Sequence, residues 1–326
     1  MASIVNAIGY ALGKLHAGML TYLCDLHREG DKEPLRQVLQ ALNLPVPHTP
    51  VAKREWNGID LAIFDGDPVN TPSMLVEIKV DDHEHATRRK VNGHKIVDAQ
   101  TKVYAQAYPD CPTRLFLTLG FGEAYGPPAG PFRWIRTAEF YRSLTHIRST
   151  DPVLTAWREA IAYELRLREA ALANDRSESL RFRGGAWNLY VLGALRDDLS
   201  ALNPSQTFRC YAYGSAPDTI LNLGWDLRPT YMEINNNGRL NLKIDLRKLS
   251  TEERGAALKQ AHDKVQHIPN VTMCTTRINA NSKTFARFDV GLRCDGDRLV
   301  FGTNRADTVK RTHAAYTAIR DVFVRP

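Results

Sequence analysis

The stretch IDLAIFDGDPVNTPSMLVEIKV, residues 59–80, predicts the centre of the fold. Its two ends, 59–65 and 74–80, alternate between two sets of residues, as a β-strand with two different faces does. The segment between them, rich in Gly, Pro and Asn, is typical of a turn. In the second strand Glu77 and Lys79 share one face, and Val76, Ile78 and Val80 share the other. A solvated ion pair on a half-exposed strand would explain these two charges if they stood alone.

The first strand carries Asp60 on its more polar face. If the two strands pair through the connecting turn, Asp60 comes beside Glu77. Two carboxylates that converge on one sheet face are costly unless a cation joins them, and a hard divalent cation prefers oxygen ligands. The backbone carbonyl of Ile78 would supply a further oxygen, and Lys79 would reach a bound water or a phosphate. An ion-pair network without any ligand is the alternative.

A helix is predicted downstream, over residues 94–107, with a buried strand at 113–120 after it. Gln100 and Tyr104 are four residues apart and therefore lie on one face of this helix. If that face covers the polar side of the sheet, an amide and a phenol join the carboxylates. Otherwise Tyr104 is a core aromatic residue with its hydroxyl at the edge of the core.

Upstream, apolar residues at helical spacing predict helices at 3–27 and 33–43, followed by a strand at 51–56. The first part of the chain therefore reads helix, strand, strand, strand, helix, strand. The rest predicts a mixed set of elements: helices at 137–147, 152–174, 186–201, 251–266 and 305–324, a hairpin turning at Asn237-Gly238, and strands near 284–293 and 298–302.

These elements predict an α/β and α+β protein with three parts. Residues 1–150 form the domain that carries the charged strands, 151–185 form a helical linker region, and 186–326 form an α+β domain for recognition of a substrate or partner. The net charge of +7 permits a polyanionic partner. No apolar run approaches the roughly 20 residues of a membrane span, so no membrane partner is expected.

The five cysteines are scattered and include no C-x-x-C pair, which argues against a disulfide framework and against a thiolate zinc site. The N-terminal apolar stretch has no basic leader before it and is spaced like an amphipathic helix. We therefore expect a reducing, cytoplasmic location.

The polar segment 81–93 is predicted to be a loop. Its Arg88, Arg89 and Lys90 would contact a nucleic-acid backbone, or they form a solvated charged run. His83 and His85 are two residues apart, unlike the H-E-x-x-H spacing that puts two histidines on one helix face. A flexible loop is therefore expected here in preference to a zinc site.

This set of residues resembles the PD-(D/E)XK nuclease superfamily. The resemblance is carried by Asp60, by EIK at 77–79 and by QTKVY at 100–104, and it covers residues 1–120. It implies a restriction-endonuclease-like core in the order αβββαβ, with the C-terminal mixed α+β domain beside it. The Gln-x-x-x-Tyr spacing marks one branch of the superfamily, which includes recombination and phage-related exonucleases.

Two upstream segments extend the resemblance to prokaryotic nucleases of this superfamily, several of which occur in defence or mobile-element contexts. They are HAGMLTYL, which begins at His16, and REWNGIDL, which holds Glu55. The resemblance would place His16 near the active site. The alternative is that His16 lies on the inner face of its helix with its hydrogen bonds made inside the core. Ile59 stands where the family name has Pro, a residue that members often lack.

The resemblance implies a Mg²⁺-dependent DNA nuclease, acting as an endonuclease or as an exonuclease, in which Mn²⁺ can replace Mg²⁺ and the product carries a 5′-phosphate. Asp60 and Glu77 would bind the metal, Lys79 would assist the attacking water, and Gln100 and Tyr104 would position Lys79 or a phosphate oxygen. Glu55 would hold a second metal or a basic side chain. Antiviral defence or DNA processing is the expected setting, with a second copy or a regulatory protein as a further partner. The alternatives are an RNA-cleaving nuclease, or a non-catalytic nucleic-acid-binding or assembly protein on a nuclease-like scaffold.

Overall fold

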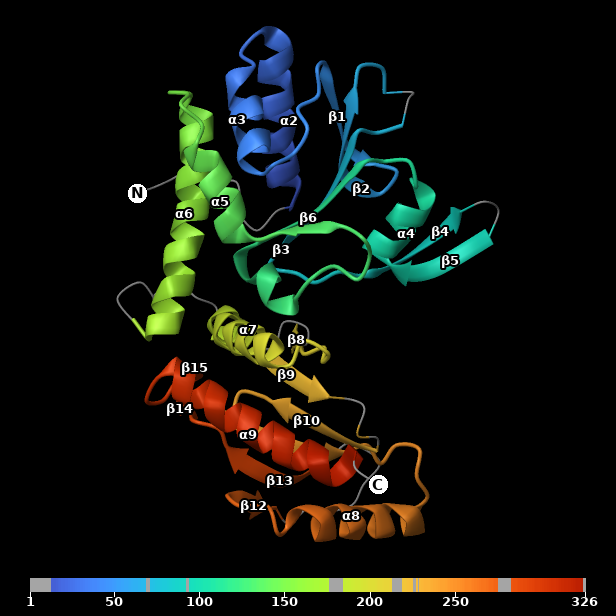
Figure 1. Cartoon of the computed structure of the whole chain (residues 1–326), viewed down its shortest axis with the longest axis vertical. Helices are drawn as coiled ribbons and strands as arrows, with labels where there is room; N and C mark the ends of the chain where they lie inside the picture. The colour runs from blue at the N-terminus through green and yellow to red at the C-terminus, as the bar shows by residue number, and fades with distance from the viewer. Residues whose placement is uncertain are drawn as a thin grey trace. The chain divides into compact units, whose positions relative to one another are not determined.

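The computed structural model describes residues 13–68, 71–91, 94–175, 184–212, 219–224, 227, 229–274 and 283–324 (Figure 1). The chain forms two compact units, Met1–Leu167 and Arg168–Pro326, and each contains both helices and strands. The mixed α/β and α+β class predicted from the sequence is therefore confirmed. Among the helices in these ranges, none combines the length and the apolar character that a bilayer crossing requires.

The first unit contains a five-stranded sheet with the strand order β1-β2-β3-β6-β7. Strands β1, β2 and β3 form an antiparallel meander, whereas β6 runs parallel to β3 and β7 runs parallel to β6. The predicted strands 59–65 and 74–80 are confirmed without any shift of their ends. The strands are β1 (Pro50–Trp56), β2 (Ile59–Asp65), β3 (Met74–Val80), β6 (Thr113–Leu119) and β7 (Arg133–Ile135).

One face of this sheet carries the larger apolar core. Leu61, Val76 and Leu117 pack there in a single cluster with buried residues of the helices. The helices that contribute are α2 (Gly13–Glu29), α3 (Glu33–Ala41), α5 (Thr137–Thr145) and the first half of α6 (Pro152–Ala173). The alternation of the strands places these apolar residues on one side, whereas Asp60, Glu77 and Lys79 point to the other side.

The other face carries a smaller cluster, in which Phe64, Leu75 and Phe116 pack against Tyr104. Tyr104 belongs to α4 (Gln100–Ala107), which follows β3 in the chain and precedes β6. Figure 1 shows α4 next to the β4–β5 hairpin, apart from α2 and α3. The helix that carries the Gln-x-x-x-Tyr spacing therefore covers the same sheet face as Glu77 and Lys79, which lie two and four residues after Leu75 on β3.

The start of α6 belongs to the core of the first unit. Trp157 is fully buried and donates its Nε1–H to Nδ1 of His16, 3.0 Å away. His16 is itself fully buried, which is the satisfied-core arrangement expected as one of its two alternatives. The first unit extends past residue 150 to Leu167, and the beginning of the segment 151–185 packs in its core.

The segment after β3 differs from the prediction. Residues 86–91 and 94–99 pair as β4 (Ala86–Val91) and β5 (His94–Ala99), so the expected loop is wrong over 86–91 and the expected helix is wrong over 94–99. Residues 81–85 are neither helix nor strand, as expected, and the helix α4 begins at Gln100. Val91 pairs with His94, which leaves a two-residue connection of sequence Asn-Gly, outside the described residues. Asn-Gly is a strong signal for a tight hairpin, and the β-branched residues on β5 favour a strand.

The second unit contains a six-stranded antiparallel sheet in the order β12-β13-β11-β10-β9-β8. The predicted hairpin is confirmed as β10 and β11, and Gly238 in its turn has a φ of 68°. The elements are α7 (Gly184–Leu202), β8 (Arg209–Ala212), β9 (Thr219–Gly224), β10 (Thr230–Ile234), β11 (Arg239–Ile244), α8 (Thr251–Val265), β12 (Val271–Met273), β13 (Lys283–Asp289), β14 (Leu292–Asp295), β15 (Arg298–Phe301) and α9 (Arg305–Val324).

Candidate metal and catalytic site

The pairing of β2 with β3 brings the two candidate carboxylates together. Leu61 pairs with Val76, so the next position in this register places Asp60 opposite Glu77. Next to this position the Ile78 N–H is bound by a side chain: it donates a hydrogen bond of 2.7 Å to Asp60 Oδ2. Asp60 and Glu77 therefore lie on one sheet face, at the end of the paired region of the two strands.

Glu77 and Lys79 form a buried ion pair on this face. The Lys79 Nζ lies 2.7 Å from Glu77 Oε1, and the two residues are 8% and 1% exposed. The second oxygen, Glu77 Oε2, is buried and has no hydrogen-bond partner in the described part of the chain. A buried carboxylate oxygen without a partner is costly, so this geometry leaves an acceptor available for a ligand.

Both carboxylates are shifted toward the protonated form. Burial, and then the charge of Asp60, raise the pKa of Glu77 to about 7, against the opposing effect of Lys79. Burial also raises the pKa of Asp60, although the Ile78 N–H and Lys79 act in the other direction. Raised carboxylate pKa values at one place are typical of sites whose charge is balanced by a bound cation or used in catalysis.

Two further oxygen atoms were predicted near these carboxylates. In an extended strand the N–H and C=O of one residue point to the same side, so the Ile78 carbonyl faces the side from which Asp60 approaches. Glu55, at the end of β1, forms an exposed ion pair of 2.7 Å with Lys14, which is the basic-side-chain partner expected as one of its alternatives. The charge of Glu55 also acts to raise the pKa of Asp60.

Gln100 and Tyr104 connect the strand ends to the loop after β3. Gln100 Oε1 accepts from the His85 N–H at 3.3 Å, and Gln100 Nε2 donates to Tyr104 Oη at 3.4 Å. Tyr104 in turn donates to the Gly58 carbonyl at 2.6 Å, two residues before Asp60. Burial, followed by the charge of Glu77, raises the pKa of Tyr104 to about 12, so its hydroxyl keeps its proton near neutral pH.

The three predicted nucleic-acid contacts lie on β4, but they are not equivalent. Arg88 is exposed. Arg89 is half-buried, because it donates to the Asn57 carbonyl at 3.1 Å and to the Tyr108 hydroxyl at 2.6 Å. Lys90 is described only by its backbone, which pairs with Lys95. Arg89 therefore holds the hairpin to the body of the unit.

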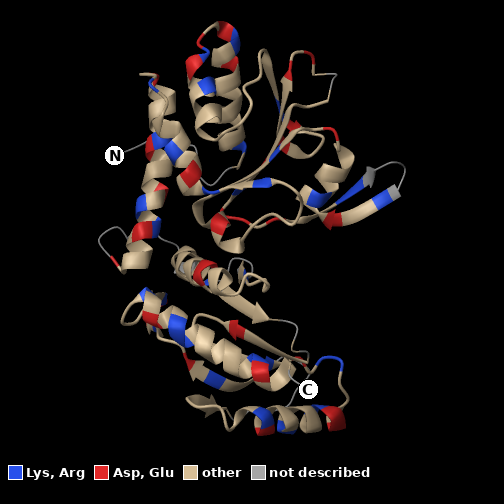
Figure 2. Ribbon diagram, in the orientation of Figure 1, with Lys and Arg blue, Asp and Glu red and all other residues tan. Residues whose placement is uncertain are grey.

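The structure adds Lys95 to this set, because it is exposed on β5 and paired with Lys90. Figure 2 shows basic residues on both strands of the hairpin. The sequence pattern missed Lys95 since the residue was assigned to a helix. Recognition of the Asn-Gly turn would have placed it on the hairpin.

Glu84 is a further residue that the sequence did not single out. Its Oε1 accepts from the Thr101 N–H at 2.7 Å, in the first turn of α4, and its Oε2 accepts from the Ala129 N–H at 2.8 Å. A carboxylate in the first turn stabilises a helix through its free N–H groups. Glu84 thus fixes the start of the helix that carries Gln100, and its charge also acts to raise the pKa of Glu77. No local sequence signal reveals this contact, because 17 residues separate its partners.

Comparisons with protein-family models, with curated proteins and with solved structures found no match for this chain. The chemistry of the site therefore has to be inferred from its geometry. Two carboxylates, one with a free buried oxygen, stand beside an ammonium group and below a Gln–Tyr pair. This arrangement can hold a cation and present a proton donor next to it.

Proposed function

We propose that this chain is a Mg²⁺-dependent nuclease that hydrolyses phosphodiester bonds of DNA. The observation that carries the proposal is the free buried oxygen of Glu77 beside Asp60 and Lys79. A structural ion pair would be expected to satisfy both carboxylate oxygens. A carboxylate that binds a metal ion needs an oxygen without a hydrogen-bond partner in the metal-free protein.

The order of the elements supports the same proposal. A helical layer precedes the meander β1-β2-β3, α4 follows, and β6 pairs in parallel with β3. This is the αβββαβ order of the PD-(D/E)XK core that the sequence resembles. We infer that residues of the first unit adopt a restriction-endonuclease-like core, in which Asp60, Glu77 and Lys79 occupy the positions of the family motif.

The donor set fits a hard divalent cation. Asp60, Glu77 and the Ile78 carbonyl would hold Mg²⁺, and each offers the oxygen ligands that this ion prefers. Mn²⁺ would accept the same oxygen ligands. When bound, the ion supplies positive charge and Lewis acidity at the scissile phosphate. The raised pKa values of the two carboxyl groups describe the metal-free protein, and deprotonation must accompany binding.

Lys79, Gln100 and Tyr104 have separate roles in the proposed reaction. The Lys79 ammonium has three N–H donors and uses one for Glu77, so the others can orient the attacking water and stabilise charge on a phosphate oxygen. The water oxygen bonds to phosphorus as the P–O3′ bond breaks. The attacking water gives up a proton to solvent, and the leaving O3′ oxygen takes one up from solvent, so the step adds one water in total. Gln100 and Tyr104 hold the Gly58 turn, and hence Asp60, in register with α4.

The β4–β5 hairpin supplies the contact with the nucleic-acid backbone in this proposal. Arg88 and Lys95 are exposed on it, and the hairpin lies in the chain between the strand of Glu77 and the helix of Gln100. Exposed Arg and Lys side chains bind phosphates of either DNA or RNA without reading sequence. The choice of DNA rests on the family resemblance.

The test measures cleavage of plasmid, linear duplex, single-stranded DNA and RNA, each with Mg²⁺, with Mn²⁺ and with a chelator. We expect metal-dependent cleavage of DNA. Asp60→Asn and Lys79→Ala should each lower the rate at least about 100-fold while the far-UV circular dichroism spectrum stays unchanged. Lys32→Ala, an exposed lysine before α3, is the matched control and should keep full activity.

Three results would contradict the proposal. If the protein cleaved RNA but not DNA, the substrate would be RNA and the proposal of DNA would be wrong. Nucleic-acid binding without cleavage by the folded wild-type protein would favour a non-catalytic scaffold. If the folded Lys79→Ala variant kept full activity, Lys79 would have no part in the reaction.

A further inference from the structure

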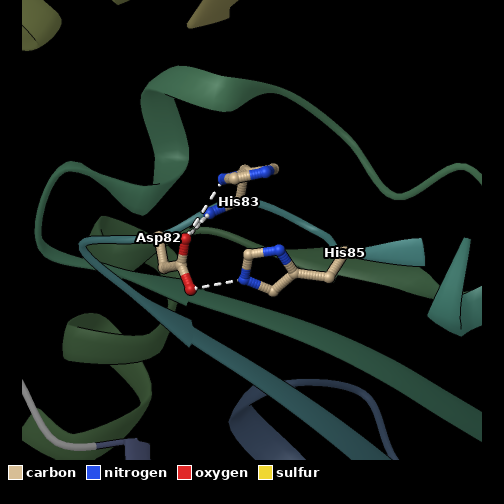
Figure 3. A group of neighbouring side chains, drawn as sticks. All are labelled: Asp82, His83 and His85. Atoms are coloured by element: carbon tan, nitrogen blue, oxygen red, sulfur yellow. Dashed lines mark hydrogen bonds and ion pairs between the residues drawn. The ribbon is translucent and has the colours of Figure 1, made fainter. Parts of the chain in front are cut away.

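Asp82, His83 and His85 form a second cluster of metal-binding side chains in the first unit (Figure 3). Asp82 Oδ1 lies 3.1 Å from His83 Nδ1, and Asp82 Oδ2 lies 2.7 Å from His85 Nε2. One donor atom from each of the three residues lies within 4.8 Å of the other two. The cluster directly follows β3, so it is separate from the Asp60–Glu77 pair but close to it in the chain.

The spacing of the two histidines suits this local backbone. Residues 82–85 are neither helical nor part of a strand in the structure. The H-E-x-x-H comparison applies to a helix, so it does not argue against a shared ligand for two histidines on this non-helical segment. The ring centroids of His83 and His85 are only 4.3 Å apart.

Neighbouring elements hold the cluster from two directions. The His83 ring packs on Tyr125 of η1 (Gly120–Tyr125), with ring centroids 5.4 Å apart. The His85 N–H is bound by Gln100 Oε1 on α4. Supported ligands lose less conformational freedom on binding. The side chains of all three residues are about half exposed, so an ion from solution has access to them.

We propose that Asp82, His83 and His85 bind a divalent transition-metal ion such as Zn²⁺. Two imidazole nitrogens and one carboxylate suit Zn²⁺, Co²⁺ or Ni²⁺, which accept nitrogen ligands, whereas Mg²⁺ prefers oxygen. Three protein ligands leave the remaining positions of the ion to water or a ligand. The binding itself does not depend on the proposed nuclease activity.

The position of the cluster gives the ion a structural effect. His85 anchors Gln100, Gln100 contacts Tyr104, and Tyr104 binds the Gly58 turn. An ion that fixes His85 would therefore stabilise the connection between the loop after β3 and the turn before Asp60. An effect of this ion on catalysis rests on the proposed nuclease function, because it would act through the position of Asp60.

The test is a Zn²⁺ titration of the full chain in competition with a chromophoric chelator. We expect one tight equivalent for the wild-type protein, with a higher melting temperature when Zn²⁺ is present. His83→Ala and His85→Ala should each weaken that equivalent at least about tenfold, and Co²⁺ should give an absorption spectrum that His85→Ala changes. His146→Ala, an exposed histidine after α5, is the control and should bind as the wild type does.

A variant at the other site separates this inference from the nuclease proposal. Asp60→Asn should lose cleavage but keep the Zn²⁺ equivalent. Absence of a stoichiometric Zn²⁺ equivalent in the wild-type protein would overturn the inference, whether or not the protein cleaves DNA. The same conclusion would follow if folded His83→Ala and His85→Ala proteins bound Zn²⁺ as tightly as the wild type.

Discussion

The raised pKa of Glu77 predicts that the metal-free protein loses stability as the pH rises. Glu77 titrates near pH 7 in the folded state, where burial and the charge of Asp60 favour the protonated form, and near its ordinary value of 4.5 when unfolded. A carboxyl group with a raised folded pKa contributes its full stability below the unfolded pKa and loses it as the pH rises to the folded pKa. The whole loss is on the order of 3 kcal/mol.

Most of this change falls in a range where the protein can be measured. With the two pKa values above, the free energy of unfolding should fall by about 2 kcal/mol between about pH 5.5 and pH 8 because of Glu77 alone. Urea unfolding of chelator-treated protein measures this difference. Glu77→Gln removes the titrating group, so its curve should be flatter than that of the wild type by the same amount. Glu252→Gln, which changes an exposed carboxylate on α8, should leave the difference unchanged.

Magnesium binding provides the matching measurement. Because Glu77 must lose its proton to bind a cation, the affinity for Mg²⁺ should rise about tenfold from about pH 6 to pH 8. Calorimetric titration in buffers of different ionisation enthalpy would show the released proton. Parallel stability curves for the wild type and Glu77→Gln, together with a Mg²⁺ affinity independent of pH, would refute this account of the site.

Three other substitutions test separate contacts. Tyr104→Phe leaves the Gly58 carbonyl without its donor, so urea unfolding should show a loss of about 1–2 kcal/mol and cleavage should slow; an unchanged stability would contradict the contact. Trp157→Phe removes the buried hydrogen bond to His16 and should cost about 1–3 kcal/mol, while the folded variant keeps its cleavage rate. Arg88→Ala should reduce the slope of log affinity for duplex DNA against log salt by about 0.9, measured by fluorescence anisotropy, and an unchanged slope would exclude a phosphate contact.

The strands that carry the charged residues could be predicted because their pattern is strong. In both seven-residue runs apolar residues recur at every second position, at Ile59, Leu61 and Ile63 and at Val76, Ile78 and Val80, and a turn-rich segment separates the runs. That pattern also fixed which face Asp60, Glu77 and Lys79 share. Their burial could not be predicted in the same way, because it depends on α4, whose helical face is packed against the sheet by contacts distant in sequence.

The hairpin shows where pattern reading failed. The segment from His94 to Ala99 has residues that fit either a helix or a strand, and its short length gives little periodicity to decide. The sequence Asn92-Gly93 is the deciding signal, because Asn-Gly favours a two-residue hairpin connection, and Val91 pairs with His94 in the structure. The strand β7 was missed for a simpler reason, since three residues carry no pattern of their own.

The local backbone explains why the sequence did not predict the cluster of Asp82, His83 and His85. A spacing of two residues separates histidines on a helix, whereas in this non-helical segment the two ring centroids lie 4.3 Å apart. Residues 82–85 are non-helical because β3 ends before them and the β4–β5 hairpin follows, so His83 and His85 face one carboxylate. A ligand spacing thus predicts a metal site only after the local backbone is known. If folded His83→Ala and His85→Ala proteins bound Zn²⁺ normally, this backbone argument would fail even though the distances stand.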